Sequence, residues 1–258
     1  MWQSGDAYEA FMGRWSRRLA ETFVRRLDAP ASRRWLDVGC GTGALTSAVL
    51  TAADPAEVAG VDPSEGFLET ARERLTDPRA SFTLADAREL PFPDDRFDVV
   101  VSGLVLNFVP DPAAAAAEIK RVTVSGGSAV AYLWDLAQGM ELLRHFWDAA
   151  AELDPAAADL HEGRRFPLCR PEPLGRLWTD ADFTGVSVSE IKIPTVFAGF
   201  DDYWRPFLGA QGPAPAYLAT LPEARRDQIR ELLRSRLPTS PDGSIPLSAR
   251  AWVVRGTA

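Results

Sequence analysis

Cysteine and histidine are scarce in this chain of 258 residues, which contains two of each. The cysteines, Cys40 and Cys169, form no Cys-x-x-Cys pair, and His145 and His161 do not cluster with them. A structural zinc site needs about four such ligands at close spacing. The sequence therefore predicts no bound metal, and it suggests no disulfide.

The sequence also lacks a long apolar run. No uninterrupted apolar stretch reaches the length needed to span a membrane. The first residues, Met-Trp-Gln-Ser-Gly-Asp, have neither the basic start nor the apolar run of a signal peptide. We therefore expect a soluble, cytoplasmic protein.

Lysine is nearly absent, since it occurs only at Lys120 and Lys192. The formal net charge is −8 and the isoelectric point is about 4.9. A nucleic acid or an anionic membrane would favour a basic face. We expect neither partner, and we interpret the arginines within residues 14–26 as a solvated helix face.

The composition that remains is globular, with 46% apolar and 25% charged residues. Strand-like and helix-like segments alternate along the first half of the chain. The predicted strands are 35–38, 57–62, 80–85, 97–102 and 128–134. This alternation predicts an α/β fold with a doubly wound parallel sheet. Because no repeat or low-complexity linker interrupts the chain, we expect a single domain with a helical cover.

The first predicted strand runs directly into a glycine-rich turn, Gly39-Cys40-Gly41-Thr42-Gly43-Ala44, and a helix follows. Such a turn brings bare backbone close to a ligand at a helix N-terminus. Asp62 and Asp86 follow the second and third strands in the same way. Ligands of open α/β sheets bind at the carboxyl ends of the strands. The sequence therefore predicts a ligand site at this edge of the sheet.

The glycine pattern alone also fits a dinucleotide, so an NAD(P)-dependent oxidoreductase is an alternative. Asp37 stands two residues before the first glycine, where its carboxylate would repel a pyrophosphate and attract an ammonium or sulfonium group. Asp62 suits a ribose carrying two hydroxyls, and Asp86 can accept from the exocyclic amine of adenine. These acids favour an adenosine with a cationic, amino-acid-like tail.

Three stretches resemble class I S-adenosylmethionine (SAM) dependent methyltransferases. They are Leu-Asp-Val-Gly-Cys-Gly-Thr-Gly, then Gly-Val-Asp-Pro-Ser, then Ala-Asp-Ala-Arg-Glu-Leu-Pro-Phe-Pro-Asp-Asp-Arg-Phe-Asp-Val-Val. The resemblance covers about residues 35 to 135. It implies SAM as cofactor and a Rossmann-like, seven-stranded, mostly parallel sheet with helices on both faces. The last strand would be antiparallel and inserted beside strand six. The implied layout of the single domain is lid helices over 1–30, a SAM-binding core over 31–135, helical cover insertions at 136–183 and 198–241, and closing strands at 184–197 and 244–256.

The resemblance also implies roles for individual residues. Gly39, Cys40 and Gly41 would lie against the methionine part of SAM, and Asp62 would bind the ribose. The remaining contacts implied for the cofactor are Pro63 and Phe67 flanking the adenine, Asp86 and Ala87 at its edge, Leu104 near the amino group, Arg14 on the carboxylate, and Tyr8 closing over it. Asp37 is expected either to face the ligand cation or to fix the glycine turn.

No residue is assigned as the catalytic base. A methyl group on sulfonium is intrinsically electrophilic, so holding the nucleophile in line and excluding water can suffice. If the nucleophile arrives protonated, His145 and Asp135 are candidates for a base, as is His161, with Asn107 as an orienting group. The stretch after the fourth strand is Gly-Leu-Val-Leu-Asn-Phe-Val-Pro instead of Asn-Pro-Pro-Tyr, which disfavours amino-methylation of adenine or glutamine.

Aromatic residues gather outside the predicted core, and we expect Trp15, Trp134, Trp147 and Trp204 to line an acceptor pocket. A closed aromatic pocket favours a small organic acceptor over a nucleic acid or a protein surface. The sequence thus predicts a SAM-dependent methyltransferase acting on a small molecule. The alternatives are the oxidoreductase and a non-catalytic SAM-binding protein.

Overall fold

The structure is a computed structural model that describes residues 12–209 and 212–258. The chain forms two compact units. The first, here called the sheet unit, comprises Ser16–Leu133, Arg170–Ile191 and Trp252–Ala258. The second, the helical unit, comprises Met1–Trp15, Trp134–Cys169 and Lys192–Ala251. Each unit is described by itself.

The sheet unit begins with the predicted alternation of strands and helices. Its elements are α2 (Arg14–Leu27), β1 (Arg34–Val38), α3 (Ala44–Ala52), β2 (Glu57–Asp62), α4 (Glu65–Arg74), β3 (Ala80–Leu84), β4 (Phe97–Gly103), α5 (Pro112–Val122) and β5 (Thr123–Trp134). The apolar run of β4 is buried along almost its whole length, as expected of a strand with both faces covered. Asp111 caps α5 by accepting a hydrogen bond from the Ala114 backbone N–H, and Pro112 occupies the first turn.

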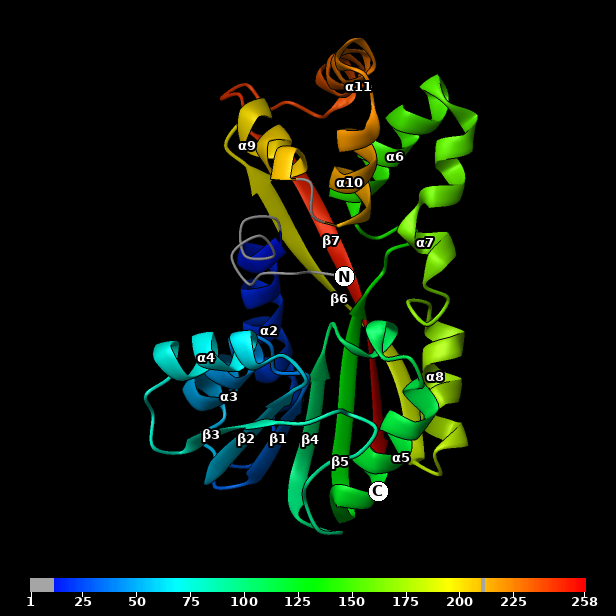
Figure 1. The fold of residues 1–258 in the computed structure, drawn as a ribbon. Helices are drawn as coiled ribbons and strands as arrows, with labels where there is room; N and C mark the ends of the chain where they lie inside the picture. The colour runs from blue at the N-terminus through cyan, green and yellow to red at the C-terminus, as the bar shows by residue number, and fades with distance from the viewer. Residues whose placement is uncertain (1–11, 210–211) are drawn as a thin grey trace. The chain divides into compact units, whose positions relative to one another are not determined.

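The seven strands lie in the order β3-β2-β1-β4-β5-β7-β6. β6 (Thr184–Phe197) and β7 (Ile245–Thr257) are the late strands, and β7 is inserted between β5 and β6. β1 pairs in parallel with β2 and β4, as β2 does with β3 and β4 with β5. Figure 1 shows β7 running opposite to its neighbours. The predicted Rossmann-like sheet, with its antiparallel last strand beside strand six, is confirmed.

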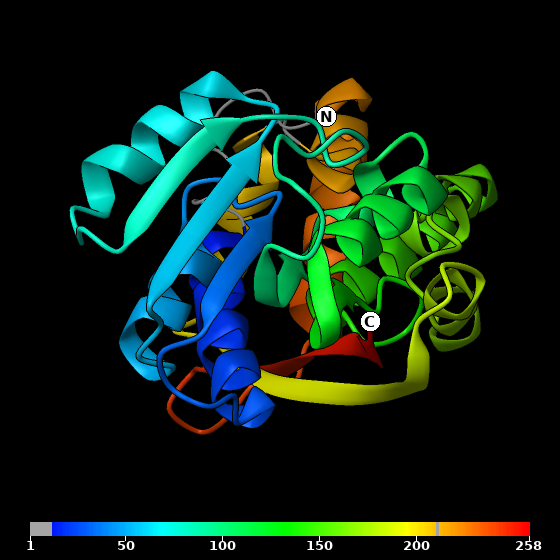
Figure 2. The same ribbon diagram turned by 90° about the horizontal axis from the view of Figure 1, so that it is seen from below.

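Helices cover both faces of the sheet, with α2, α3 and α4 on one side and α5 and α8 (Pro171–Asp180) on the other (Figures 1 and 2). Phe23 of α2 packs on Tyr132 of β5, with ring centroids 4.5 Å apart. The Trp178 indole of α8 donates a hydrogen bond to the Ala129 carbonyl of β5. The lid role expected of residues 1–30 stays a prediction, and its first eleven residues lie outside the described part of the chain.

Two predictions of local structure are wrong. The fifth strand begins at Thr123 and not after Gly126-Gly127, because α5 passes directly into the strand where the Thr123 hydroxyl bonds the Ile119 carbonyl. The sequence of residues 155–173 also predicts an irregular segment, whereas the structure forms η3 (Pro155–Leu160), α7 (Glu162–Arg165) and the first turn of α8 there. Asp154 and His161 cap the first two by accepting hydrogen bonds from backbone N–H groups two residues ahead.

The helical unit contains α6 (Glu141–Leu153), α9 (Phe200–Trp204), η4 (Arg205–Gly209), α10 (Pro213–Thr220) and α11 (Glu223–Arg236). Its core is aromatic: Phe146 stacks on Phe207 with centroids 4.6 Å apart, and the buried Tyr203 hydroxyl donates to the Leu142 carbonyl. Among the described helices, none combines the length and apolar character required to cross a bilayer.

Candidate functional site

The glycine turn is fixed to the end of β2 by its backbone. The N–H groups of Gly39 and Cys40 both donate to the Val61 carbonyl, at 2.8 and 2.9 Å. Gly39, Gly41 and Gly43 have φ values of 76°, 54° and 85°, which side chains rarely tolerate. The sequence pattern therefore reflects a backbone that only glycine adopts without strain.

The two sides of the turn differ. A Cβ atom on Gly39 would lie 2.5 Å from the Val105 side chain, whereas a Cβ on Gly41 would meet nothing within 4 Å. Leu104, just before Val105, has a φ of 63°, and its N–H donates to the Tyr132 carbonyl. A non-glycine residue held in this region is strained, as is common at ligand sites. The turn thus packs on one side and leaves open space beside Gly41.

Asp37 lies fully buried beneath the turn. Its Oδ2 accepts a hydrogen bond from the Thr46 hydroxyl at 2.7 Å, while Oδ1 is buried without a partner among the described residues. Burial raises the pKa of the Asp37 carboxyl to about 7, against the Thr46 hydrogen bond, and the nearby Asp62 charge adds to the rise. A buried carboxyl with an unpaired oxygen is suited to a cationic ligand group, because a nearby positive charge favours the ionised form of the carboxyl.

Asp62 holds the turn at its other end. One carboxylate oxygen accepts from the Gly41 N–H at 3.0 Å and the other from the Ser64 N–H at 2.9 Å. Burial raises the pKa of Asp62, and these two hydrogen bonds oppose the rise. Each oxygen keeps a further lone pair, so the same carboxylate has the capacity to accept from ribose hydroxyls.

The residues expected around an adenine lie at the start of α4 and after β3. Phe67 is half-buried and Pro63 exposed, whereas Leu68 and Ala71 form the buried side of α4. Phe67 is therefore not a core residue of its helix. Ala87 is buried, and Asp86 is bound by Arg88 through its backbone N–H and its guanidinium, which lower the pKa of Asp86 to about 2.

Cys40 is a packing residue of the turn. Its thiol is buried, and burial raises its pKa well above the ordinary value. A Cβ atom on Gly60 would lie 2.9 Å from the Cys40 sulfur, so β2 leaves room for the thiol. A thiol kept protonated in this way is a poor nucleophile.

Arg14 and Tyr8 are not placed with these residues. Tyr8 lies outside the described residues. Arg14 belongs to the helical unit, where its guanidinium pairs with Asp202 at 3.1 Å and stacks over the rings of Trp15 and Phe197. Their roles toward the SAM carboxylate stay predictions.

The candidates for a general base differ in whether other groups bind them. Asp135 accepts from the backbone N–H groups of Ala137 and Gln138 and from Arg250, with a shortest distance of 2.6 Å. This ion pair ties β5 to β7 within the helical unit. His145 is half-buried, and burial followed by the Arg144 charge lowers its pKa. It therefore stays neutral near neutral pH, as a base must.

His161 and Asn107 lie in different units. His161 uses its Nδ1 to cap α7, and its pKa is lowered by burial. Asn107 lies in η2 (Leu106–Phe108), directly after the strained Leu104. The catalytic and orienting roles of these four residues stay predictions.

The four tryptophans expected to line an acceptor pocket all belong to the helical unit, and all are buried. The Trp147 indole donates to Glu162, a buried carboxyl that no sequence pattern indicated. Trp204 packs on Phe207, with centroids 6.0 Å apart. The indole N–H groups of Trp15 and Trp134 have no partner among the described residues. Within residues 12–209 and 212–258, no group of three or more acidic, cysteine or histidine side chains could hold a metal ion.

Comparison with known proteins fits this geometry. The sequence model of a family described as a methyltransferase domain matches residues 36–131. A demethylmenaquinone methyltransferase of Clavibacter sepedonicus is 43% identical over 108 residues, covering 42% of this chain and 43% of that protein. Methyltransferase GfsG of Streptomyces halstedii is 39% identical over 114 residues, covering 43% and 41%. The chain spans about two fifths of the length of the curated relatives it matches.

Among solved structures, phosphoethanolamine N-methyltransferase 2 of Haemonchus contortus in complex with SAM has a TM-score of 0.59 to this chain at 20% identity. The similarity covers 97% of this chain and 56% of the other. The fold is thus that of the Rossmann-like methyltransferases. Residues 36–131 are similar to the family described as a methyltransferase domain.

Proposed function

We propose that this protein transfers the methyl group of SAM to a small organic acceptor. The observation that carries the proposal is the unpartnered Oδ1 of Asp37, buried beneath a glycine turn that is open beside Gly41. The tail of SAM carries an ammonium and a sulfonium group, and either supplies the positive charge that this carboxyl lacks. A pyrophosphate in the same place would bring negative charge close to the carboxyl groups of Asp37 and Asp62. The resulting repulsion disfavours the oxidoreductase alternative.

The chain's own residues would divide the work of holding SAM. Gly39, Cys40 and Gly41 present backbone to the methionine part, and Asp62 accepts from the ribose hydroxyls. The adenine lies between Pro63 and Phe67 and meets Asp86 and Ala87 at its edge. Leu104, Arg14 and Tyr8 contribute to the amino-acid end. When bound, SAM supplies a methyl group activated by sulfonium, so the protein's task is orientation and exclusion of water.

The acceptor is proposed to meet the unpaired donors of the helical unit. Among the described residues, the buried indole N–H groups of Trp15 and Trp134 have no hydrogen-bond partner, and the buried Thr195 hydroxyl has none either. Buried unpaired donors cost free energy that an acceptor's oxygen atoms would offset. This chemistry favours a small molecule with carbonyl, phenol or enol oxygens, enclosed by Trp147 and Trp204. The name of the Clavibacter relative, a demethylmenaquinone methyltransferase, is consistent with a small acceptor.

The net charge of −8 supports the proposal that no nucleic acid or membrane is a partner. A cytoplasmic location belongs to the same proposal, and cell fractionation tests it.

Calorimetric titration with S-adenosylhomocysteine and with NAD tests the donor. We expect S-adenosylhomocysteine to bind and NAD not to, and the opposite result would reject the proposal. Incubation of labelled SAM with fractionated metabolite extracts then tests transfer. Label in a small-molecule product supports the enzyme, whereas binding without transfer in any fraction would favour the non-catalytic SAM-binding alternative.

A further inference from the structure

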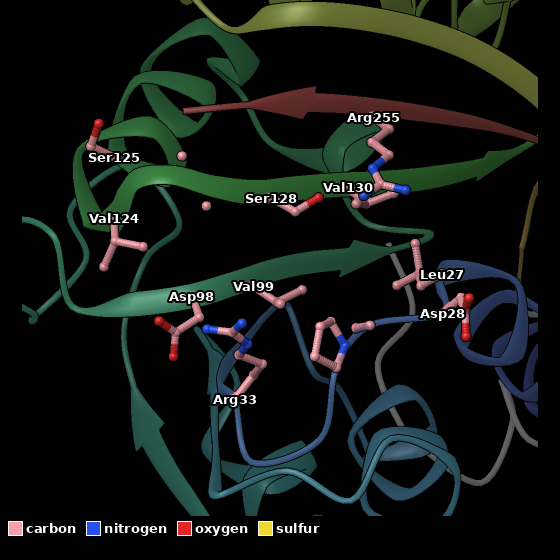
Figure 3. Close-up of a pocket in the computed structure, with 14 residues that line it drawn as sticks. Leu27, Asp28, Arg33, Asp98, Val99, Val124, Ser125, Ser128, Val130 and Arg255 are labelled. Atoms are coloured by element: carbon pink, nitrogen blue, oxygen red, sulfur yellow. The ribbon is translucent and has the colours of Figure 1, made fainter.

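Apart from the glycine turn, the sheet unit has a cavity with a volume of about 310 Å³. Its walls are the end of α2 with the loop that follows, the start of β4, the start of β5, and Arg255 near the end of β7 (Figure 3). These are the amino ends of β1, β4 and β5, whereas the glycine turn follows the carboxyl end of β1. The two sites are therefore at opposite ends of the same strands.

Two arginines in this cavity are uncommitted. Arg33 and Arg255 line it, and both are exposed. Within the described residues, neither makes a hydrogen bond or an ion pair with its guanidinium. An arginine without an acceptor has five N–H donors and a permanent charge available to a ligand.

The acidic residues of the cavity do not cancel this charge. Asp98 is held by Arg34, whose Nε and Nη2 donate at 3.0 and 3.1 Å, and it also accepts from the Arg34 backbone N–H. The bonds from Arg34 come first in lowering the pKa of Asp98, and Arg33 adds only a longer-range charge effect. Asp28 is exposed and forms no ion pair within the described residues. Because Arg34 offsets the charge of Asp98, Asp28 is the carboxylate that remains among the lining residues to offset Arg33 and Arg255.

The wall of the cavity is formed by a bulge in β5. Phe97 pairs with Thr123 and Val99 with Ser128, so residues 124–127 loop out of register. Gly126 has a φ of 76°, and a Cβ on Gly127 would lie 3.0 Å from the Asp98 carbonyl. The Ser128 side chain lies over β5 with its oxygen on the side of Arg255 (Figure 3). Ser128, which follows the bulge, therefore offers a hydroxyl donor on the side of Arg255.

We propose that this cavity binds a small oxyanion, a phosphate or a carboxylate, through the arginines that line it, Arg33 and Arg255. Guanidinium groups recognise both kinds of oxyanion through paired N–H donors, and the Ser128 hydroxyl supplies a further one. The size of the cavity suits a small metabolite and not a polymer. The bound anion would be separate from SAM, since the glycine turn lies at the other end of the strands.

Calorimetry with inorganic phosphate and with succinate, at matched ionic strength, tests this proposal. Saturating S-adenosylhomocysteine is added so that an anion cannot be measured at the SAM site. We expect one anion per chain, with affinity reduced about tenfold or more in Arg33→Gln and in Arg255→Gln, because each loses a charge-assisted hydrogen bond. Arg176→Gln is the matched control, since Arg176 is exposed on α8 of the same unit and outside the cavity.

The two ligands distinguish the sources of the anion: binding of phosphate alone assigns a phosphate site, and binding of succinate alone a carboxylate site. Equal affinities in all three variants and the parent would show that the anion binds elsewhere. Absence of binding by both ligands at millimolar concentrations would also overturn the proposal. Because each variant replaces an exposed side chain, circular dichroism should show an unchanged fold.

Discussion

Affinity for S-adenosylhomocysteine is expected to rise with pH between about pH 5 and about pH 7, because of Asp37. Burial raises the pKa of this carboxyl to about 7, from an ordinary value of 3.8. In the free protein it is therefore mostly protonated below neutrality. A ligand ammonium group near Oδ1 favours the ionised form, so binding releases a proton, and proton release makes affinity increase with pH.

The magnitude follows from the titration. Below the pKa, each pH unit lowers the ionised fraction about tenfold, which changes the binding free energy by about 1.4 kcal/mol. Above about pH 7 the affinity should level off. The stability of the free protein, in contrast, should decrease as the pH rises. The neutral carboxyl contributes fully to stability below about pH 4, and this contribution of about 4 kcal/mol is lost as the pH rises through about 7.

Isothermal titration calorimetry over this pH range, in buffers of different ionisation enthalpy, measures both the affinity and the released proton. The variant Asp37→Asn cannot ionise and should give a flat profile. It keeps His145, His161 and Asp62, so a slope that persisted in it would belong to one of those groups. The matched ligand is 5′-methylthioadenosine, which has the nucleoside but no ammonium group.

We expect the pH dependence of 5′-methylthioadenosine binding to be flat. If this ligand shows the same slope as S-adenosylhomocysteine, Asp37 does not respond to the ligand cation. In that case the carboxyl acts only on the glycine turn through Thr46, and the argument for a cationic ligand fails.

Three further variants test other parts of the sites. Asp62→Ala removes the acceptor of the Gly41 N–H and should weaken S-adenosylhomocysteine about tenfold or more by calorimetry; unchanged affinity would reject the ribose assignment. Trp15→Phe removes a buried donor that has no partner among the described residues, so it should cost less stability in urea than Trp147→Phe, which leaves Glu162 without its donor; an equal or larger loss would mean that the Trp15 indole N–H is paired. Glu162→Gln should gain stability over the parent as pH rises, because burial raises the pKa of Glu162 and its neutral form is lost at high pH. Parallel stability profiles of parent and variant would contradict this last expectation.

The sheet and the placement of its acidic residues could be predicted because both depend on local sequence. Short apolar stretches mark β1, β2 and β4, which are five to seven residues long, and turn residues fix where each strand ends. Asp37 and Asp62 come to the same edge because parallel strands end together. The wrong boundary of β5 has a local cause as well: a glycine pair usually signals a turn, but here it forms a bulge within a strand.

Partners distant in sequence could not be predicted. Nothing near Trp147 indicates that its indole binds Glu162, and Asp135 and Arg250 are separated by more than a hundred residues. Asp135 looked like a reactive acid because it ends a strand, as Asp37 does. The structure gives it two backbone donors and a guanidinium, which leaves it a structural ion pair. The sequence shows where an acid lies, but its contacts decide whether it is available.

That distinction separates Asp37 from Asp62 although both end neighbouring strands. Asp62 receives two backbone N–H groups, which stabilise its negative charge and commit it to the shape of the glycine turn. Asp37 is bound only by Thr46, is about half ionised near pH 7, and has no partner for its Oδ1 among the described residues. Burial raises the pKa of both carboxyls, but their different contacts give them different tasks. One carboxyl builds the turn and the ribose contact, and the other responds to the charge of the ligand. Both carboxylates would repel a phosphate ligand. Discrimination between SAM and a dinucleotide therefore depends on this pair more than on the glycines, which suit either ligand.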